Sequence, residues 1–513
     1  MTLPDNSQAL VIGGGFAGVE AAWALAEAGI RVAIAEMRPV KMTPAHKTGD
    51  LAELVCSNSF KSDSPAAASH LLKEEMRRMG SLTMRGAEAS KVPAGAALAV
   101  DRDTFARYIT NAIETHPNIT LIREEITEPP AGLPAIIATG PLTSEALSEY
   151  IATLTGADYL FFHDAIAPTV EAESINLERV YHASRYDKGD GGYLNCAMSQ
   201  DEYYAFLDAL LSAERVEGHD FENLHLFEGC MPIEEMASRG RETLTFGPLK
   251  PVGLADPRTG KRAYAVAQLR QENLAATMYG LVGFQTRLKF PEQKRVFRML
   301  PGLENAEFSQ YGAMHRNTYI NSPRILDATL RFVGSKKQHS ASSIQHSGFR
   351  IPDASQDSGF RIQDSADQGS GFRIQDSADA ERHPERSEAR AESKDSPLLP
   401  LSPSPPRSLY FAGQIVGVEG YVESAATGIV AGQALAAQLA GETFRPLPPQ
   451  TILGALCHYV AYSDPESFQP MNACFGILPP SSLKAKKLVR HAAMVERGIA
   501  AMERWLRETG DRT

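Results

Sequence analysis

The first apolar positions of the chain form a short run that ends in glycines. Residues 10–12 are consecutively apolar, as in a strand that is buried on both faces. Residues 21–27 continue at helical spacing, Gly29 ends that helix, and residues 30–35 form a second apolar run. This order of strand, glycine-rich turn, helix and strand predicts the first β-α-β unit of a parallel sheet.

The glycines between the two apolar runs have the spacing G-x-G-x-x-G, with Gly13, Gly15 and Gly18 at the fixed positions. The first glycine permits a tight turn, the second lets the backbone approach a pyrophosphate, and the third lets the helix pack on the strand. Glu36 ends the second run about 20 residues beyond the glycines, where a carboxylate accepts hydrogen bonds from a ribose. Because the whole unit is present in order, we predict that a dinucleotide is bound by Gly13, Gly14, Gly15, Phe16, Ala17, Gly18 and Glu36.

The strand pattern of this first domain stops near residue 140 and returns after residue 301. Strands at 119–124 and 135–140 suit a chain that returns to the first sheet. Between them and the later strands, helices alternate with irregular segments rich in Gly, Pro and aromatic residues, which indicates an inserted domain. We therefore predict an α/β fold, in which a Rossmann-type domain carries an inserted α+β domain and a C-terminal helical segment. The predicted ranges are 1–140 and 302–440 for the Rossmann-type domain, 141–301 for the inserted, substrate-binding domain, and 441–513 for the C-terminal segment.

A second strand, glycine turn and helix stand near the C-terminus. Residues 409–412 have the pattern of a strand, Gly413 of its turn, and small residues follow at helical spacing from Val422. In many flavoproteins the N-terminus of such a helix faces the flavin, and its dipole stabilises negative charge there. We add Gly413, Gln414, Glu423 and Ser424 to the candidates for cofactor binding.

Residues 336–407 differ from the rest of the chain. They are poor in apolar residues, lack sustained periodicity, and repeat Ser-Gly-Phe-Arg-Ile from Ser347, Ser358 and Ser370. Three short polar repeats are too few to stack as a solenoid. The composition predicts a disordered insertion in a surface loop.

Charge and cysteine content narrow the class of protein. The net charge of −11 argues against indiscriminate nucleic-acid binding, although a local basic surface is compatible with it. No apolar run is long enough to span a bilayer and no signal peptide is seen, so we expect a cytoplasmic protein. The five cysteines form no C-x-x-C pair, so neither a metal site nor a vicinal disulfide is predicted.

Two of the cysteines stand at predicted turns. Cys56 is followed by Ser-Asn-Ser, and either a buried structural thiol or a reactive one fits that position. Cys230 lies between Gly and Met-Pro, and the nearby Arg239 and Arg241 would lower a thiol pKa. A basic and aromatic cluster between residues 284 and 298, which includes Lys289 and Arg295, suits either a nucleic-acid surface or a solvated charged face.

A series of short motifs runs in order along nearly the whole chain. They are GGGFAG at 13–18, LVCSNS at 54–59, ATGPL at 138–142, SRYDKG at 184–189, FEGCMP at 227–232, ASRGR at 237–241, GFQT at 283–286, PGLENA at 301–306, HRNTYINSP at 315–323, FAGQ at 411–414 and GVEGYVES at 417–424. Together they resemble the bacterial folate/FAD-dependent tRNA (uracil-5-)-methyltransferases, the TrmFO branch of the MnmG/TrmFO flavoprotein family. The segment 336–407 departs from that family's pattern.

The resemblance implies that the Rossmann-type domain binds FAD, with methylenetetrahydrofolate as carbon donor and NADH or NADPH as reductant. The substrate would be the T-loop uridine of tRNA, which becomes ribothymidine, and no obligatory protein partner or membrane is implied. Cys230 would be the nucleophile at C6 and Cys56 the base at C5, although the reverse assignment stays open. His315 would stack on the folate. The candidates for folate or tRNA contact are His315, Arg316, Arg239, Arg241, Lys289 and Arg295.

Other classes of function remain open from the residues. A GidA/MnmG-like enzyme of the wobble uridine would have a larger C-terminal helical region than this chain. A small-molecule FAD oxidoreductase would need neither a basic surface nor two cysteines at turns. A non-catalytic RNA-binding flavoprotein would tolerate the loss of Cys56 and Cys230.

Overall fold

The structure of the protein is a computed structural model. It describes residues 4, 6–156, 160–165, 167–187, 192–216, 231–312, 314–334, 408–481, 483 and 485–510, with the backbone alone at 160–165, 187 and 314–318. Cys230 and the repeat-bearing segment 336–407 lie outside the described residues. No helix in the described ranges combines the length and apolar character that crossing a membrane requires.

The first domain is built on a parallel sheet of five strands in the order β16-β7-β1-β2-β6. The strands are β1 (Ala9–Ile12), β2 (Val32–Ala35), β6 (Ile119–Ile122), β7 (Ala135–Ile137) and β16 (Leu409–Phe411). β1 is central and pairs in parallel with β2 and β7, and β16 returns from the far end of the chain to pair with β7. The predicted α/β fold with a parallel sheet is confirmed.

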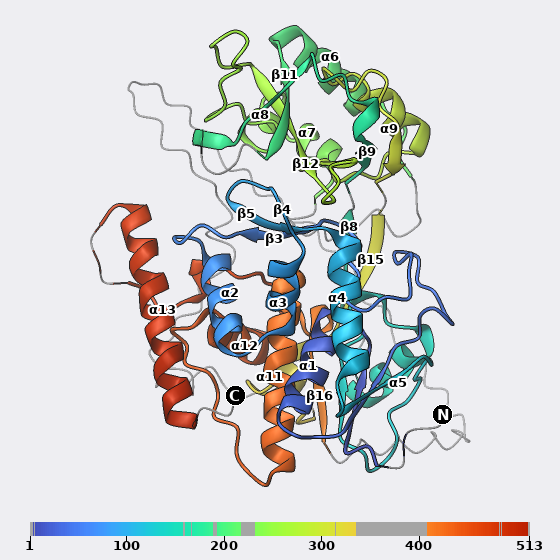
Figure 1. Cartoon of the computed structure of the whole chain (residues 1–513), viewed down its shortest axis with the longest axis vertical. Coiled ribbons are helices and arrows are strands. Elements are labelled where there is room, and N and C mark those ends of the chain that lie inside the picture. The colour runs from blue at the N-terminus through green and yellow to red at the C-terminus, as the bar shows by residue number, and fades with distance from the viewer. Residues whose placement is uncertain are drawn as a thin grey trace, which may run out of the picture.

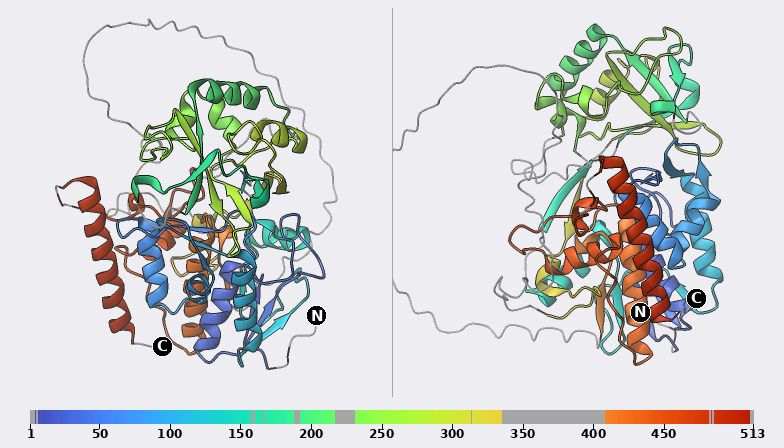
Figure 2. Two further views of the ribbon diagram at one scale, coloured as in Figure 1. Left: turned by 45° about the horizontal axis from the view of Figure 1, so that its top comes forward. Right: turned by 90° about the vertical axis from the view of Figure 1, so that its left-hand side faces the viewer.

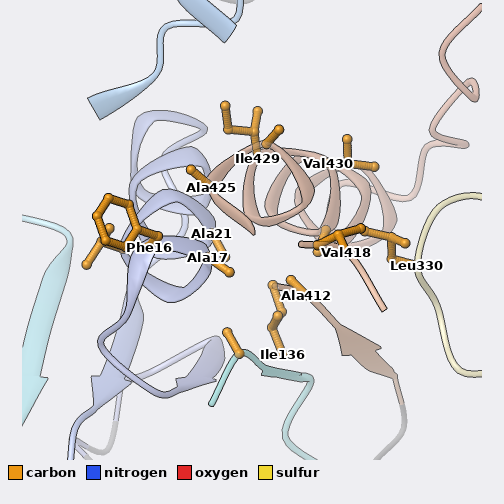
Figure 3. Close-up of a cluster of buried hydrophobic side chains, with 14 of the residues drawn as sticks. Phe16, Ala17, Ala21, Ile136, Leu330, Ala412, Val418, Ala425, Ile429 and Val430 are labelled. Carbon is orange, nitrogen blue, oxygen red and sulfur yellow. The ribbon is translucent and has the colours of Figure 1, made fainter. Parts of the chain in front are cut away.

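Two helices from opposite ends of the chain pack tightly over this sheet, α1 (Phe16–Glu27) and α11 (Tyr421–Leu439) (Figure 1). A Cβ atom at Gly428 would lie 2.1 Å from the carbonyl oxygen of Ala17, and one at Gly432 would lie 2.7 Å from that of Ala21. Small residues therefore let the two backbones touch, as the close-up of Ala17, Ala21 and Ala425 shows (Figure 3). The contact fixes the N-termini of both helices beside each other.

The surrounding helices are α2 (Ala68–Arg78), α3 (Leu82–Ala89), α4 (Arg102–Thr115), α5 (Glu145–Thr155), α12 (Ile452–Tyr462) and α13 (Lys487–Thr509). Two buried carboxyl groups tie α2 to α12 and α1 to α3. Glu75 of α2 accepts hydrogen bonds from the first amides of α12, Ile452 at 2.8 Å and Leu453 at 2.9 Å. Burial raises the pKa of Glu75 to about 8. Glu20 of α1 accepts in the same way from the start of α3, with the Thr83 amide at 2.7 Å. Each carboxyl group thus accepts hydrogen bonds from free amides at the N-terminus of a neighbouring helix.

The second domain lies above the first in Figure 1 and has its own hydrophobic core. Its antiparallel sheet has the order β10-β11-β12-β13-β9-β14. The strands are β9 (Thr169–Glu171), β10 (Val180–His182), β11 (Tyr193–Met198), β12 (Ala265–Gln271), β13 (Met278–Leu281) and β14 (Phe308–Gln310), and the helices are α6 (Gln200–Ser212), α7 (Ile233–Ser238), α8 (Thr243–Phe246) and α9 (Phe290–Phe297). Leu147, Tyr150 and Ile151 of α5 belong to the core of the first domain, and Ala306 belongs to that of the second.

Two smaller sheets complete the fold. β3 (Ser59–Ser62), β5 (Ala97–Val100) and β4 (Lys91–Val92) form an antiparallel sheet at the top of the first domain in Figure 1, next to the second domain. Figure 2 shows the two domains from two further sides. β8 (Leu160–Ala165) and β15 (Met314–Tyr319) pair antiparallel and connect the domains. We propose that this pair marks the entry to and the exit from the inserted domain. The short α10 (Ser322–Ile325) follows β15.

Candidate active site

A cavity of about 460 Å³ opens where the parallel strands of the first domain end. Its walls come from the glycine turn after β1, the loop after β2, the segment after β7 and the N-terminus of α11. Arg270 and Gln285 contribute from the second domain. The lining includes Gly13, Gly14, Gly15, Phe16, Ala17, Glu36, Arg38, His46, Cys56, Lys61, Gly413, Gln414, Tyr421 and Ser424.

The glycine turn has the form that a bound dinucleotide needs. A Cβ atom at Gly13 would lie 2.6 Å from the Ala138 oxygen, and one at Gly18 would lie 1.8 Å from the Gly13 oxygen. At Gly15 nothing lies within 4 Å, so the space over this residue is open. Gly15 caps α1 without a side-chain hydrogen bond, which leaves amide groups of the helix N-terminus for phosphate oxygens. The residues present fit the pyrophosphate of FAD.

Glu36 is held ionised at the end of β2. One carboxylate oxygen accepts from the Gly14 amide at 2.8 Å, and the other accepts from the amide and Nε of Arg38, both at 2.9 Å. Burial opposes the charge, but these hydrogen bonds and the Arg38 charge hold the pKa of Glu36 below its ordinary value. An ionised carboxylate in this position can accept hydrogen bonds from a ribose.

The loop after β2 adds two residues that the sequence analysis did not identify, Arg38 and His46. Arg38 is almost completely buried and also donates to Glu53 at 3.1 Å. Burial and the Arg38 charge lower the pKa of His46 to about 4, so its imidazole is neutral near pH 7. The only signal in the sequence was their place in a polar loop directly after Glu36.

The second glycine turn brings the N-terminus of α11 to the cavity. Gly413 has φ +87° and Gly420 has φ +115°, conformations that residues with a side chain rarely adopt. Gln414 and Ser424, two of the predicted cofactor-contact residues, line the cavity. Glu423 does not line it: the side chain is buried, receives a hydrogen bond from Lys61 Nζ at 2.7 Å, and Lys61 lines the cavity in its place.

Cys56 reaches the cavity beside the start of α11. Its Sγ atom lies 2.9 Å from the Tyr421 hydroxyl, and its own amide donates to the same oxygen at 2.8 Å. Burial and the neighbouring Cys56 raise the pKa of Tyr421 well above its ordinary value, so the phenol stays protonated. Because the phenolic oxygen already accepts from the amide, its O–H group can donate to a thiolate at Cys56.

The loop that carries Cys56 is bound from both domains. Arg270 of β12 donates to Asn58 Oδ1 at 2.7 Å and to Ser57 Oγ at 3.0 Å. Arg102 of α4 donates to the Cys56 carbonyl oxygen at 3.1 Å and pairs at 2.8 Å with Glu272, the residue directly after β12. The position of the thiol therefore depends on how the two domains pack together.

The four other predicted side chains that the structure describes, Arg239, Arg241, Lys289 and Arg295, do not line the cavity. Arg241 pairs with Asp208 at 3.3 Å and lies over the Tyr204 ring, and Arg239 ends α7 at an exposed position, so neither lines the cavity. Lys289 pairs with Glu214 at 2.8 Å and Arg295 pairs with Glu292. The backbones of His315 and Arg316 lie in β15, opposite Asp164 and His163.

The other described cysteines have no place at the cavity. Burial raises the pKa of the Cys196 and Cys457 thiols to about 12 in each case, which keeps them unreactive. Cys474 is half-buried. No cluster of metal-ligating side chains occurs in the part of the chain that the structure describes.

Comparison with known proteins agrees with this architecture. The family model described as glucose inhibited division protein A matches residues 8–345 and 400–443. The solved structure of Aquifex aeolicus GidA superimposes with a TM-score of 0.59 at 14% identity, covering 99% of this chain and 77% of that one. Fold and cavity thus define a two-domain nucleotide-binding protein of the GidA class.

More similar sequences narrow the family. The chain is 48% identical to the methylenetetrahydrofolate–tRNA-(uracil-5-)-methyltransferase TrmFO of Geobacter sulfurreducens, over 97% of this chain and 98% of that protein. It is 49% identical to the TrmFO protein of Heliobacterium modesticaldum over the same shares. The chain belongs to the TrmFO family.

Proposed function

We propose that this protein transfers a one-carbon unit from methylenetetrahydrofolate to C5 of the T-loop uridine of tRNA and reduces it to the methyl group of ribothymidine. FAD would be the resident cofactor, and NADH or NADPH the reductant. The observation that carries the proposal is Cys56, which a tyrosine hydroxyl at 2.9 Å holds in a cavity formed by two glycine turns. Family membership supports the substrates. A tRNA substrate is consistent with a cytoplasmic protein.

The chain offers a separate contact for each part of the cofactor. Amides of Gly13 to Gly15 and the N-terminus of α1 would hold the pyrophosphate, and Glu36 the ribose. The N-terminus of α11, next to Gln414 and Ser424, would face the flavin. When bound, FAD would pass the one-carbon unit from folate to the base and supply the hydride that completes the methyl group.

The pyrimidine requires a nucleophile and a base. Uracil C5 becomes nucleophilic only after a thiolate adds to C6. Once C5 has bonded to the one-carbon unit, its proton must be removed, and the thiolate leaves C6 when hydride completes the methyl group. We assign the addition to Cys230 and the proton removal to Cys56. The Tyr421 hydroxyl would keep the Cys56 thiolate oriented before the proton arrives.

The test uses tRNA with fluorine at C5 of the target uridine, because fluorine cannot leave as a proton does. The nucleophile then stays bonded to C6 and the adduct can be mapped by mass spectrometry. Cys56→Ala should form the adduct but no product from normal tRNA, whereas Cys230→Ala should form neither. An adduct on Cys56 would reverse the two roles, and full activity of both variants would remove the thiol mechanism.

The overall reaction is checked separately. Purified protein is incubated with isotope-labelled methylenetetrahydrofolate, NADPH or NADH, and unmodified tRNA, and the digested nucleosides are separated. Label in ribothymidine supports the proposal. Label at the wobble position instead, or flavin oxidation without any nucleoside product, would favour the other two flavoenzyme classes.

A further inference from the structure

Three aromatic rings form a stacked column on the second domain. Phe308 of β14 and Tyr311 have ring centroids 5.4 Å apart at an interplanar angle of 14°. Tyr311 and Phe290, the first residue of α9, have centroids 4.9 Å apart at 25°. α9 lies on the right of the upper domain in Figure 1, above the connecting strand β15. We call these three rings the aromatic column.

The column is anchored at one end and open at the other. Phe308 packs against the hydrophobic core of the second domain. The Phe290 side chain is 56% exposed, although leaving a large apolar ring in water is unfavourable in free energy. The outermost ring of the column therefore offers an aromatic surface that no described residue covers fully.

A buried amide fixes the geometry of the column. The side chain of Gln293 is completely buried, and its Nε2 donates to the Leu288 oxygen at 2.7 Å and to the Gly312 oxygen at 2.8 Å. Its Oε1 accepts from the Gly312 amide at 2.8 Å. Gln293 thus ties the segment before Phe290 to the residue after Tyr311. A column held by buried hydrogen bonds keeps its shape without a ligand.

Lysines from both domains stand next to the column. The Lys47 ammonium donates at 3.2 Å to Oε1 of Gln310, the residue directly before Tyr311. Among the described residues the Lys47 side chain has no carboxylate partner. Lys47 is exposed and belongs to the loop whose neighbours Thr43 and His46 line the cavity. Lys289 precedes Phe290 and is 52% exposed in its pair with Glu214, a surface ion pair that a phosphate can displace at small cost.

We propose that the aromatic column is a stacking platform for an unpaired base of the RNA substrate, and that Lys47 contacts the adjoining phosphate. The proposal rests on the proposed function and names a subsite for its substrate. Unpaired bases stack on fixed aromatic rings, while cations bind the phosphates between them. The column accepts a flat base on its exposed face, next to the loop that borders the cavity.

The test measures equilibrium binding of an unmodified tRNA transcript to the FAD-loaded full-length protein. The variants are Phe290→Ala, Phe290→Leu, Phe290→Trp and Lys47→Gln. Phe246→Ala is the matched control, because Phe246 is 59% exposed on α8 of the same domain. Flavin absorbance and melting temperature establish that each variant is folded.

Stacking predicts that Phe290→Ala and Phe290→Leu weaken binding about tenfold, while Phe290→Trp and Phe246→Ala leave it within about twofold. Lys47→Gln should reduce the slope of log affinity against log salt by about one. Equal affinity in all variants would overturn the proposal. So would full binding by Phe290→Leu, which would indicate apolar packing, or normal binding with an altered oligomeric state, which would indicate a protein contact.

Failure of the proposed function can be told apart from failure of this subsite. If the wild type binds tRNA and forms no ribothymidine, the proposed function fails, while the Phe290 series still decides the stacking platform. If the wild type forms ribothymidine and the Phe290 variants bind as it does, only the platform is rejected.

Discussion

The Tyr421 hydroxyl lies 2.9 Å from the Sγ atom of Cys56, although the two residues are 365 positions apart in the chain. Tyr421 is the first residue of α11, and Cys56 lies in the loop before β3. The close packing of α1 on α11 brings these two segments together, since Phe16 at the start of α1 stacks on the Tyr421 ring with centroids 4.7 Å apart. The position of the Cys56 thiol beside Tyr421 therefore depends on the contact between the two helices.

Replacing Tyr421 by Phe should test that relationship. The ring and its stacking on Phe16 remain, but the oxygen that contacts Sγ and the Cys56 amide is lost. A hydrogen bond to a charged group contributes about 1.5–3 kcal/mol, so we expect kcat to fall roughly 10- to 100-fold. FAD content should stay unchanged. Wild-type turnover in the variant would show that the hydroxyl does not act on the thiol.

Gly15→Val should separate cofactor binding from folding. The backbone at Gly15 has φ −78° and ψ −173°, which any residue adopts, and no atom lies within 4 Å of the added Cβ. We expect the unfolding free energy to change by about 1 kcal/mol or less, because only the helix cap is altered. FAD stoichiometry, read from flavin absorbance, should fall to a small fraction. Wild-type stoichiometry would mean that the pyrophosphate lies elsewhere.

Gly428→Ala should destabilise the first domain. The new Cβ would lie 2.1 Å from the Ala17 carbonyl oxygen, and backbone cannot move aside as a side chain can. Overpacking of this kind costs about 1–3 kcal/mol, which denaturant unfolding can measure. Gly86→Ala in α3 is the matched control, because its nearest atom at 2.9 Å is the end of the Ile109 side chain. An equal effect of both substitutions would argue against a rigid contact between α1 and α11.

Acid should destabilise the fold through His46. Burial and Arg38 lower the pKa of His46 to about 4 in the folded protein, against 6.5 for an ordinary histidine. The folded state therefore binds fewer protons than the unfolded state between these values, and stability falls as pH drops from 6.5 towards 4. Between pH 7 and pH 5, we expect the free energy of unfolding of His46→Gln to fall by about 1–2 kcal/mol less than that of the wild type. The measurement is thermal unfolding of both proteins at the two pH values. An equal loss of stability in the wild type and the variant would contradict the prediction.

The segment 338–404 should be removable. The chain on its two sides is paired, since the Phe332 amide donates to the Leu409 oxygen at 2.8 Å and the Phe411 amide donates to the Leu330 oxygen at 3.0 Å. A short turn can therefore replace the segment. The length of a loop between two paired ends changes the free energy of folding only slightly. We expect the deletion variant to keep FAD content and tRNA methylation within about twofold of the full chain. Loss of soluble protein on deletion would contradict the interpretation of 336–407 as a dispensable loop.

Local patterns were enough to predict the parallel sheet and the glycine turn. The Rossmann-type unit lies within the first 36 residues, and its strand, turn, helix and acid are neighbours in sequence. Apolar periodicity reports burial on a strand or helix without reference to distant residues. The motifs that resemble the TrmFO family are also short, local segments of sequence, and the comparisons confirm that family.

The side chains that surround the Cys56 thiol could not be predicted from the sequence. The sequence left Cys56 open as a structural or a reactive residue, and it gave no sign that Tyr421, Arg102 and Arg270 hold its loop from three elements. Glu423 fitted a cofactor contact by position, yet its side chain pairs with Lys61. Hydrogen bonds between residues hundreds of positions apart arise only when two domains and both ends of the chain have packed. The sequence by itself therefore determined the nucleotide-binding fold, whereas the tertiary structure alone decided which side chains surround Cys56.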